Sequence, residues 1–248
     1  MIDIFLALIL GIFVGTSLGV IGAGGAILAL PGLVAVLGFD AKIATTASTL
    51  IVGSAAAAGF ISRMKSKSLD FKIGIIFSFL GIGGTFLGTY FLRYLTDAFI
   101  LGLFSLLMFG AAIGMWRKSP TNQGNGKPRW PLVILSASLV GVATGLLGIG
   151  GGFLIVPALV IFLNVPTKIA AGTSLVAITV NSIFAFSLRY EYWPDMPWAP
   201  VLVFASSAIL ASYFTAGLAQ KMNPRSLQKG FASLISIVAT YMLISRFI

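Results

Sequence analysis

The chain has 248 residues, of which 58% are hydrophobic and 9% charged, and its mean hydropathy is +1.05. Soluble domains carry charge on roughly a quarter of their residues, so this composition excludes an ordinary soluble protein and indicates one that folds within a lipid bilayer. A net charge of +10 would suggest a nucleic-acid partner in a soluble protein. We expect no nucleic-acid partner here, because the basic residues gather in loops between apolar segments.

The sequence contains neither cysteine nor histidine. This removes disulfides, thiol nucleophiles, imidazole bases and the commonest zinc ligands together. We therefore expect no cofactor and no enzymatic activity. An intramembrane enzyme is the alternative, but it would have to work without these groups.

Apolar segments follow one another along the whole chain, and a helix needs about 20 apolar residues to cross the bilayer core. In chain order the sequence predicts a hairpin over 4–39, single crossings over 43–62, 73–92 and 98–116, a second hairpin over 130–167, and single crossings over 169–188, 196–220 and 230–245. The two hairpin stretches are too long for one helix and slightly short for two full crossings. The prediction is an all-α integral membrane protein with about ten segments, or six crossings plus two re-entrant hairpins.

Each predicted hairpin turns at a glycine cluster: Gly22, Gly24 and Gly25 in the first, and Gly148, Gly150, Gly151 and Gly152 in the second. The leg that follows the first cluster, 25–38, would be about 21 Å long at 1.5 Å per residue, which is shorter than the bilayer core of about 30 Å. We therefore expect both turns to lie at membrane depth, where irregular backbone persists only if protein buries it or it lines a wet cavity.

The two halves of the chain repeat one another at an offset of 126 residues. The matching residues are Gly15, Gly19, Gly22, Gly24, Gly25, Leu28, Pro31, Lys42, Ile43, Ala44 and Ser48 against Gly141, Gly145, Gly148, Gly150, Gly151, Leu154, Pro157, Lys168, Ile169, Ala170 and Ser174. Such a shared order indicates an internal duplication. Because each half holds five predicted segments, the second copy is expected to enter the membrane with opposite orientation.

Charge agrees with this inversion, since equivalent loops of the two halves differ in charge character. We expect the basic loops to be cytoplasmic and both termini to face outward. The basic residues assigned to these loops are Arg63, Lys65, Lys67, Lys72, Arg117, Lys118, Lys127, Arg129, Lys221, Arg225 and Lys229. Only Arg93 and Arg189 are assigned to the opposite loops. The predicted organisation is a first repeat over 1–116, a cytoplasmic linker over 117–129 and a second repeat over 130–248.

Inverted repeats typically hold a substrate where the two copies meet near the middle of the membrane. Helices that begin at the glycine turns would present unpaired N–H groups and positive dipole ends, which attract anions. Hydroxyl and amide side chains on the following helices could donate to the same solute. The candidate substrate-binding residues are Gly22, Gly24, Gly25, Thr46, Ser48, Gly148, Gly150, Gly151, Gly152, Thr173, Ser174 and Asn181.

Two simpler interpretations stay open for these residues. Glycines such as Gly11, Gly15, Gly84 and Gly88 serve close helix packing in membranes. Ser and Thr often donate only to a carbonyl of their own helix. Lys42 and Lys168 are expected to be interfacial anchors rather than ligands, which leaves no charged residue in the middle of a predicted crossing.

The chain resembles the sulfite exporter TauE/SafE family, also called the toluene-sulfonate uptake permease family. The residues that carry the resemblance are the motif Gly-Leu-Leu-Gly-Ile-Gly-Gly-Gly over 145–152, Pro157, and Lys-Ile-Ala-Ala-Gly-Thr-Ser-Leu over 168–175. The first half echoes them in Gly-Val-Ile-Gly-Ala-Gly-Gly over 19–25 and Pro31, but has Thr45-Thr46-Ala47-Ser48 in place of Gly-Thr-Ser.

This resemblance implies a secondary transporter of sulfite, thiosulfate, sulfonate or another small organic anion in the bacterial inner (plasma) membrane. An anion channel, or a carrier for a non-sulfur organic anion, is the alternative. The expected partners are a small anionic substrate and the lipid bilayer, while the oligomeric state is left open.

Overall fold

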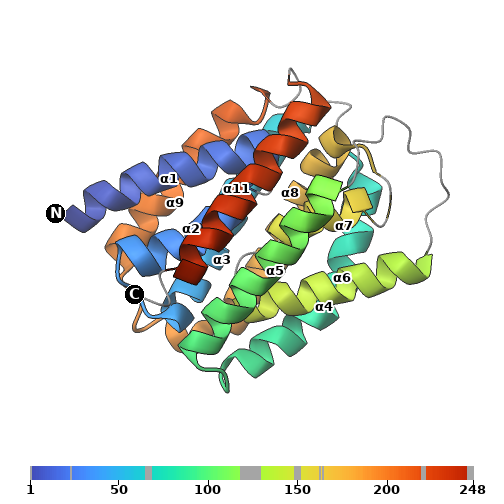
Figure 1. Cartoon of the computed structure of the whole chain (residues 1–248). Coiled ribbons are helices and arrows are strands. Elements are labelled where there is room, and N and C mark those ends of the chain that lie inside the picture. Colours follow the sequence, from blue (N-terminus) through green and yellow to red (C-terminus); the bar gives the residue numbers. More distant parts are fainter. Residues whose placement is uncertain are drawn as a thin grey trace.

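The structure is a computed structural model that describes residues 2–22, 24–64, 69–117, 130–147, 152–161, 163, 165–218 and 222–244. Within these residues the backbone is helical apart from short connections, and it contains no strand (Figure 1). The elements are α1 Ile2–Ile21, α2 Gly24–Pro31, η1 Gly32–Val36, α3 Ala41–Arg63, α4 Phe71–Leu92, α5 Asp97–Arg117, α6 Trp130–Leu147, α7 Gly152–Ile161, α8 Thr167–Leu188, η2 Tyr190–Tyr192, α9 Trp198–Thr215 and α11 Pro224–Ile244. The all-α class predicted from the sequence is confirmed.

Six of the described helices, α1, α3, α4, α5, α8 and α9, are long and apolar enough to cross a membrane. The predicted crossings over 43–62, 73–92, 98–116, 169–188 and 196–220 fall in five of them. The predicted crossing over 230–245 falls in α11, which carries Arg225 and Lys229 in its first turns and is not among the six.

Both predicted hairpins have one long and one short leg. In the first, α1 has 20 residues and is long enough to cross alone, whereas α2 has eight and the π-helical segment η1 adds five. In the second, α6 has 18 residues and α7 has ten. Pro31 has no N–H to donate, and the widened turn of η1 follows it directly, closed by a 3.3 Å hydrogen bond from Leu37 N to Gly32 O.

The most extensive helix pairings join the two halves of the chain: α1 packs along α9, and α4 packs along α6. Glycines permit the close approach, because a Cβ built on Gly15 would lie under 3.0 Å from the Ala208 backbone, and one on Gly141 equally close to that of Gly81. The packing role expected for these glycine stripes is confirmed.

Helices α3 and α8 pack against each other at the centre of the bundle, between the α1–α9 pair and the α4–α6 pair (Figure 1). Their apolar windows are 72% and 67% buried, against 39% or less for the other four candidate spans. Helices α5 and α11 lie side by side across one face.

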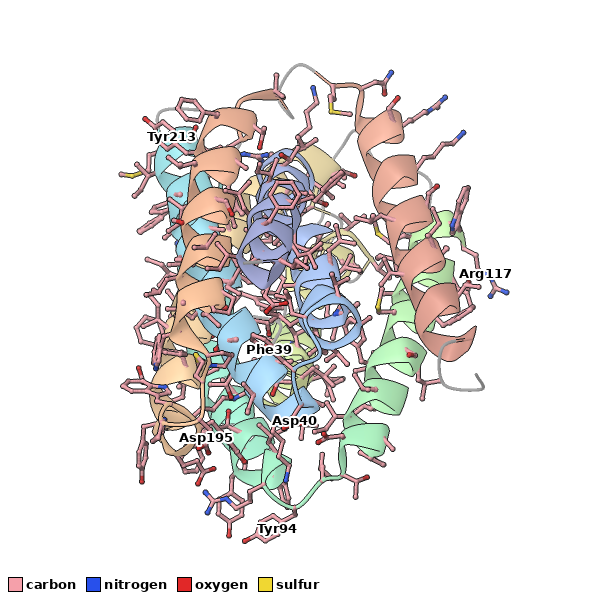
Figure 2. The ribbon with its side chains drawn as sticks, turned by 90° about the vertical axis from the view of Figure 1, so that its left-hand side faces the viewer. Phe39, Asp40, Tyr94, Arg117, Asp195 and Tyr213 are labelled. Atoms are coloured by element: carbon pink, nitrogen blue, oxygen red, sulfur yellow. The ribbon has the colours of Figure 1, made fainter. Side chains whose placement is uncertain are left out.

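The two ends of the bundle are distinct. Asp40, Tyr94 and Asp195 lie together at one end, and Tyr213 lies at the other (Figure 2). At the first end the Lys42 ammonium donates to the Arg93 carbonyl over 3.2 Å, which agrees with the anchoring role expected for this lysine.

Candidate functional site

The central helices carry the largest set of buried polar side chains in the described part of the chain. Apart from Arg63 at the end of α3 and Thr167 at the start of α8, these are Thr45, Thr46, Ser48 and Thr49 on α3 and Thr173, Ser174, Asn181 and Ser182 on α8. Five of the candidate residues therefore lie on these two packed helices. They are Thr46, Ser48, Thr173, Ser174 and Asn181. Because every one of these groups is uncharged, the centre of the bundle is polar without a fixed charge.

The hydroxyls on α3 donate to carbonyls of their own helix. Thr46 Oγ1 lies 2.9 Å from Lys42 O, Ser48 Oγ 3.0 Å from Thr45 O, and Thr49 Oγ1 2.6 Å from Thr46 O. This is the local bonding that Ser and Thr commonly adopt within helices. In this conformation their hydrogens point along α3, and binding a solute would require them to rotate.

Two hydroxyls on α8, those of Thr173 and Ser174, reach other elements. Ser174 Oγ donates to Ala171 O at 3.0 Å and to Gly22 O, in the first glycine turn, at 2.9 Å. Thr173 Oγ1 accepts a 3.0 Å hydrogen bond from Asp70 N, and the Asp70 side chain in turn caps α4 by accepting from Ile73 N. These two residues tie α8 to the turn between α1 and α2 and to the start of α4.

The first glycine turn is buried and packs directly against α8. Gly22 has a φ of +82°, a conformation that favours glycine, and its carbonyl accepts the Ser174 hydroxyl. A Cβ on Gly22 would lie under 3.0 Å from Ala171 of α8, and Cβ atoms on Gly24 and Gly25 would meet Ser17 and Val14 of α1 equally closely. The turn is therefore inside the protein, in close contact with a helix from the second half.

The second glycine turn falls largely outside the described residues. Gly148, Gly150 and Gly151 are among those not described, and Gly152 is the first residue of α7. Helix α6 ends at Leu147. The predicted turn itself is therefore outside the described residues, in the stretch of sequence between α6 and α7.

Asn181 is the most unusual of the candidate residues. It is fully buried on α8, and neither Oδ1 nor Nδ2 has a hydrogen-bond partner in the part of the chain that the structure describes. A Cβ built on Gly81 of α4 would lie 3.0 Å from Nδ2, so the amide faces the gap that this glycine leaves. The neighbouring Ser182 hydroxyl is likewise buried without a described partner. A buried amide without hydrogen-bond partners lowers the stability of the folded protein. The presence of Asn181 at this position is therefore not explained by a contribution to stability.

A separate cavity of about 470 Å³ lies between α5, α6 and α7. Its lining is apolar except for Ser136. The other lining residues are Leu103, Leu106, Leu107, Gly110, Ala111, Leu139, Val140, Val142, Ala143, Leu146, Leu154, Pro157, Ala158 and Ile161. Leu106 and Leu139 of this lining are also exposed on the outside of the bundle. Hydrocarbon would fill this space, whereas a hydrated anion would lose its hydrogen bonds there.

Two arginines that the sequence analysis assigned to loops are buried, which the sequence did not predict. Arg63 is the last residue of α3 and Arg189 directly follows α8, and they are 1% and 0% exposed. Arg63 Nη2 donates to Gly19 O, and Arg189 Nη2 donates to Gly145 O. Carbonyls in the last turn of a helix lack intrahelical donors, so a guanidinium next to such an end is drawn inward.

The internal repeat could have indicated that these two arginines occupy equivalent positions. Arg63 and Arg189 are separated by 126 residues, and so are their partners Gly19 and Gly145. Burial lowers the pKa of Arg189 to about 9, opposed in part by Tyr192, which leaves its guanidinium charged at neutral pH.

Comparison with known proteins places the chain among membrane transporters. A family model described as "Sulfite exporter TauE/SafE" matches residues 7–242. A probable membrane transporter protein of Xylella fastidiosa is 31% identical over 241 residues, which cover 94% of this chain and 92% of the relative. The probable membrane transporter protein YunE of Bacillus subtilis is 27% identical over 88% of this chain and 89% of its own length.

A third relative, a probable membrane transporter protein of Methanocaldococcus jannaschii, is 24% identical over 96% of this chain and 95% of its own length. No solved structure matches the chain significantly. The family match extends over nearly the whole length, from α1 into α11. The chain is therefore a multi-pass membrane transporter that belongs to the sulfite exporter TauE/SafE family.

Proposed function

We propose that this protein is a secondary transporter that moves a small sulfur-containing oxyanion, such as sulfite, thiosulfate or a sulfonate, by alternating access. The observation that carries the proposal is the uncharged polar centre on α3 and α8, with Asn181 buried and unpaired beside the hydroxyls. Neutral donors bind an oxyanion and still allow its release, which a carrier needs in every cycle.

We infer that the two halves are inverted five-segment repeats, α1–α5 and α6–α11. Support comes from equivalent positions that make equivalent contacts: Arg63 with Gly19, and Arg189 with Gly145. The ends of the two short legs agree as well. Phe39 N donates to Leu33 O and Val165 N donates to Leu159 O, both over 3.0 Å.

In this proposal the first glycine turn is the element that moves when the transporter changes the side of the membrane to which its site is open. The hydrogen bond from Ser174 to Gly22, with the close contact between Gly22 and Ala171, shuts that turn against α8 in this conformation. In the alternate state this contact would open. Inverted repeats exchange conformations in this manner when a carrier switches its accessible face.

We further propose that the membrane is the bacterial inner membrane and that both termini face outward. The relatives in Xylella and Bacillus are described as probable membrane transporter proteins of bacteria. The end of the bundle opposite Asp40 and Asp195 would then be cytoplasmic, in accordance with the positive-inside rule.

Reconstituted vesicles test the function. Purified protein is inserted into liposomes loaded with unlabelled sulfite, and uptake of radiolabelled sulfite is compared with uptake of thiosulfate, methanesulfonate and acetate. We expect uptake that saturates, that internal sulfite stimulates, and that acetate competes with weakly. A large conductance that does not saturate would indicate a channel, and preferential uptake of acetate would indicate a carrier for non-sulfur anions.

Variants connect this activity to α8. Ser174→Ala and Thr173→Val each remove a hydroxyl that reaches another element, and we expect each to lower the uptake rate severalfold. Ser187→Ala is the matched control, since Ser187 is exposed and donates only to Ile183 O of its own helix. Wild-type kinetics in both test variants would remove these residues from the transport site.

A further inference from the structure

The cavity between α5, α6 and α7 has the lining of a site for an apolar ligand. Ser136 is the one polar residue among the described side chains that line it, and the Ser136 hydroxyl already donates to Val133 O at 3.1 Å. The cavity volume of about 470 Å³ lies in the usual range for ligand sites, roughly 300–1,000 Å³. The ligand that fits such a lining is a hydrocarbon chain, because it needs no hydrogen-bond partner.

The cavity is open to the outer surface of the bundle. Leu106 of α5 and Leu139 of α6 line it, and both side chains are also exposed on the outside. Gly110 of α5 lines it as well, is exposed, and has no atom within 4 Å of a built Cβ. In a multi-pass membrane protein, an exposed apolar surface in the middle of a spanning helix faces lipid tails. The cavity is therefore continuous with the protein–lipid interface.

The depth of the cavity follows from its place on α5. This helix has 21 residues and ends at Arg117, so at 1.5 Å per residue it is about 31 Å long and matches the bilayer core of about 30 Å. Gly110 lies about 10 Å from the level of Arg117, and Leu103 about 21 Å from it. A lipid tail that starts at the level of Arg117 and extends to the middle of the bilayer, about 15 Å away, reaches the cavity.

Two glycines leave room for such a tail along α5. Gly114 and Gly110 precede Arg117 by three and seven residues, so all three lie on one face of the helix. A Cβ built on Gly114 would meet one described atom within 4 Å, Ile161 Cδ1 of α7, and a Cβ on Gly110 would meet none. A hydrocarbon chain can therefore lie against the α5 backbone between Arg117 and the cavity.

The end of α5 has the residues of a membrane–water interface. Trp116 and Arg117 are both exposed, and Figure 2 shows Arg117 pointing away from the helices. Tryptophan and arginine are typical of the headgroup level at the ends of spanning helices. A guanidinium also matches two oxygens of a phosphate at once.

We propose that this face of the protein binds an anionic phospholipid. Arg117 contacts the phosphate, and one acyl chain passes Gly114 and Gly110 and ends in the cavity. This site is separate from the polar centre on α3 and α8, and it is independent of the solute that the protein transports. A bound acyl chain would fill the space between α5, α6 and α7 and so stabilise the packing of these three helices.

The test measures lipid binding by the purified full-length protein in a mild detergent. Phosphatidylglycerol and phosphatidylcholine with identical acyl chains are added in equal amounts, native mass spectrometry counts the lipids that the protein retains, and the unfolding temperature is followed with each lipid. Gly110→Leu and Ala143→Leu fill the cavity from α5 and from α6, and Arg117→Gln removes the cation. The matched controls are Gly83→Leu, at an exposed glycine of α4 with open space around it, and Arg225→Gln, at an exposed arginine of α11.

We expect the wild-type protein to retain one phosphatidylglycerol with at least about fivefold preference over phosphatidylcholine, because a basic residue near the surface attracts an anionic headgroup to this extent. Phosphatidylglycerol should also raise the unfolding temperature more than phosphatidylcholine does. Arg117→Gln should retain the two lipids about equally. Both cavity-filling variants should lose the retained lipid of either kind, and both controls should behave as the wild type does.

Equal retention of the two lipids by the wild-type protein would overturn the proposal. So would undiminished retention of phosphatidylglycerol in the cavity-filling variants, of which either one suffices if the other does not fold. A mass of two protein chains that both cavity-filling variants abolish would identify a second copy of the protein as the occupant of the cavity, and would overturn the proposal as well.

Discussion

Buried polar residues on the two central helices differ in whether their hydrogen bonds are satisfied. The hydroxyls of Thr46 and Ser48 donate to their own helix, so they cost little to bury. Asn181 has neither amide atom paired within the described chain. A residue kept at a cost in stability is a stronger functional candidate than one that is satisfied where it lies.

Replacing Asn181 by leucine should therefore have opposite effects on stability and on transport. The two side chains have similar shapes, and relief of an unpaired amide should stabilise the protein by about 1–3 kcal/mol. Sulfite uptake should fall at least severalfold. Thermal unfolding in detergent and vesicle uptake, measured on the same preparation, check both parts, and a variant that is more stable and fully active would exclude Asn181 from the transport path.

Two glycines with a left-handed backbone make it possible to separate the effect of backbone strain from the effect of a close steric contact when each is replaced by alanine. Gly22 (φ +82°) faces α8 closely, whereas Gly38 (φ +69°) has open space where a Cβ would be. Alanine at either position should cost about 1–2 kcal/mol for the left-handed backbone. Gly22→Ala should in addition displace the turn from Ala171 and abolish most of the uptake, while Gly38→Ala keeps it. Equal uptake by the two variants would refute the proposal that the Gly22 contact is part of the gate.

At the scale of the helices, the pairs α1–α9 and α4–α6 depend on glycines that let two backbones touch. These contacts join the first half of the chain to the second, so neither half could form its natural packing alone. Helices α5, α6 and α7 differ from these pairs, because a cavity with an apolar lining separates them.

Gly15→Ala and Gly110→Ala compare these two environments. A methyl group on Gly15 would overlap Ala208, so this variant should lose about 1–3 kcal/mol of stability through overpacking. Gly110 lines the cavity and has nothing within 4 Å of the built Cβ, so alanine there should be neutral or stabilising, by up to about 1 kcal/mol of helix propensity. Thermal unfolding of the two proteins measures the difference, and equal stabilities would contradict the close contact of α1 with α9.

Helix boundaries show where sequence patterns suffice and where they do not. Most single crossings were predicted within a few residues, because an apolar run ends where charge begins, as at Arg63 and Arg117. The π-helical segment after Pro31 was not predicted, since the register of its hydrogen bonds depends on how α2 packs. The prediction for α9 ran to residue 220, whereas the helix ends at Thr215 in a region without a strong polar signal.

The whole molecule has two ends whose orientation in the membrane can be measured directly. The chain contains no cysteine, so single cysteines report their own accessibility. Tyr94→Cys and Asp195→Cys, at one end of the bundle, should react with an impermeant maleimide added to intact cells. Lys72→Cys and Lys229→Cys, which are exposed residues of the predicted cytoplasmic loops, should react only after the cells are opened. Reaction of all four positions from outside, or the reverse pattern, would contradict the proposed orientation.

The amino-acid sequence by itself determined the membrane setting, the helical class, most crossings and the family, because each follows from apolar run length and glycine order along the chain. The tertiary structure alone decided that Arg63 and Arg189 are buried, that Ser174 holds the first glycine turn and that Asn181 is unpaired. These features depend on contacts between residues as far apart as 153 positions. A local pattern records which residues prefer to be buried, but only the packed helices decide which donor meets which carbonyl and which donor meets none.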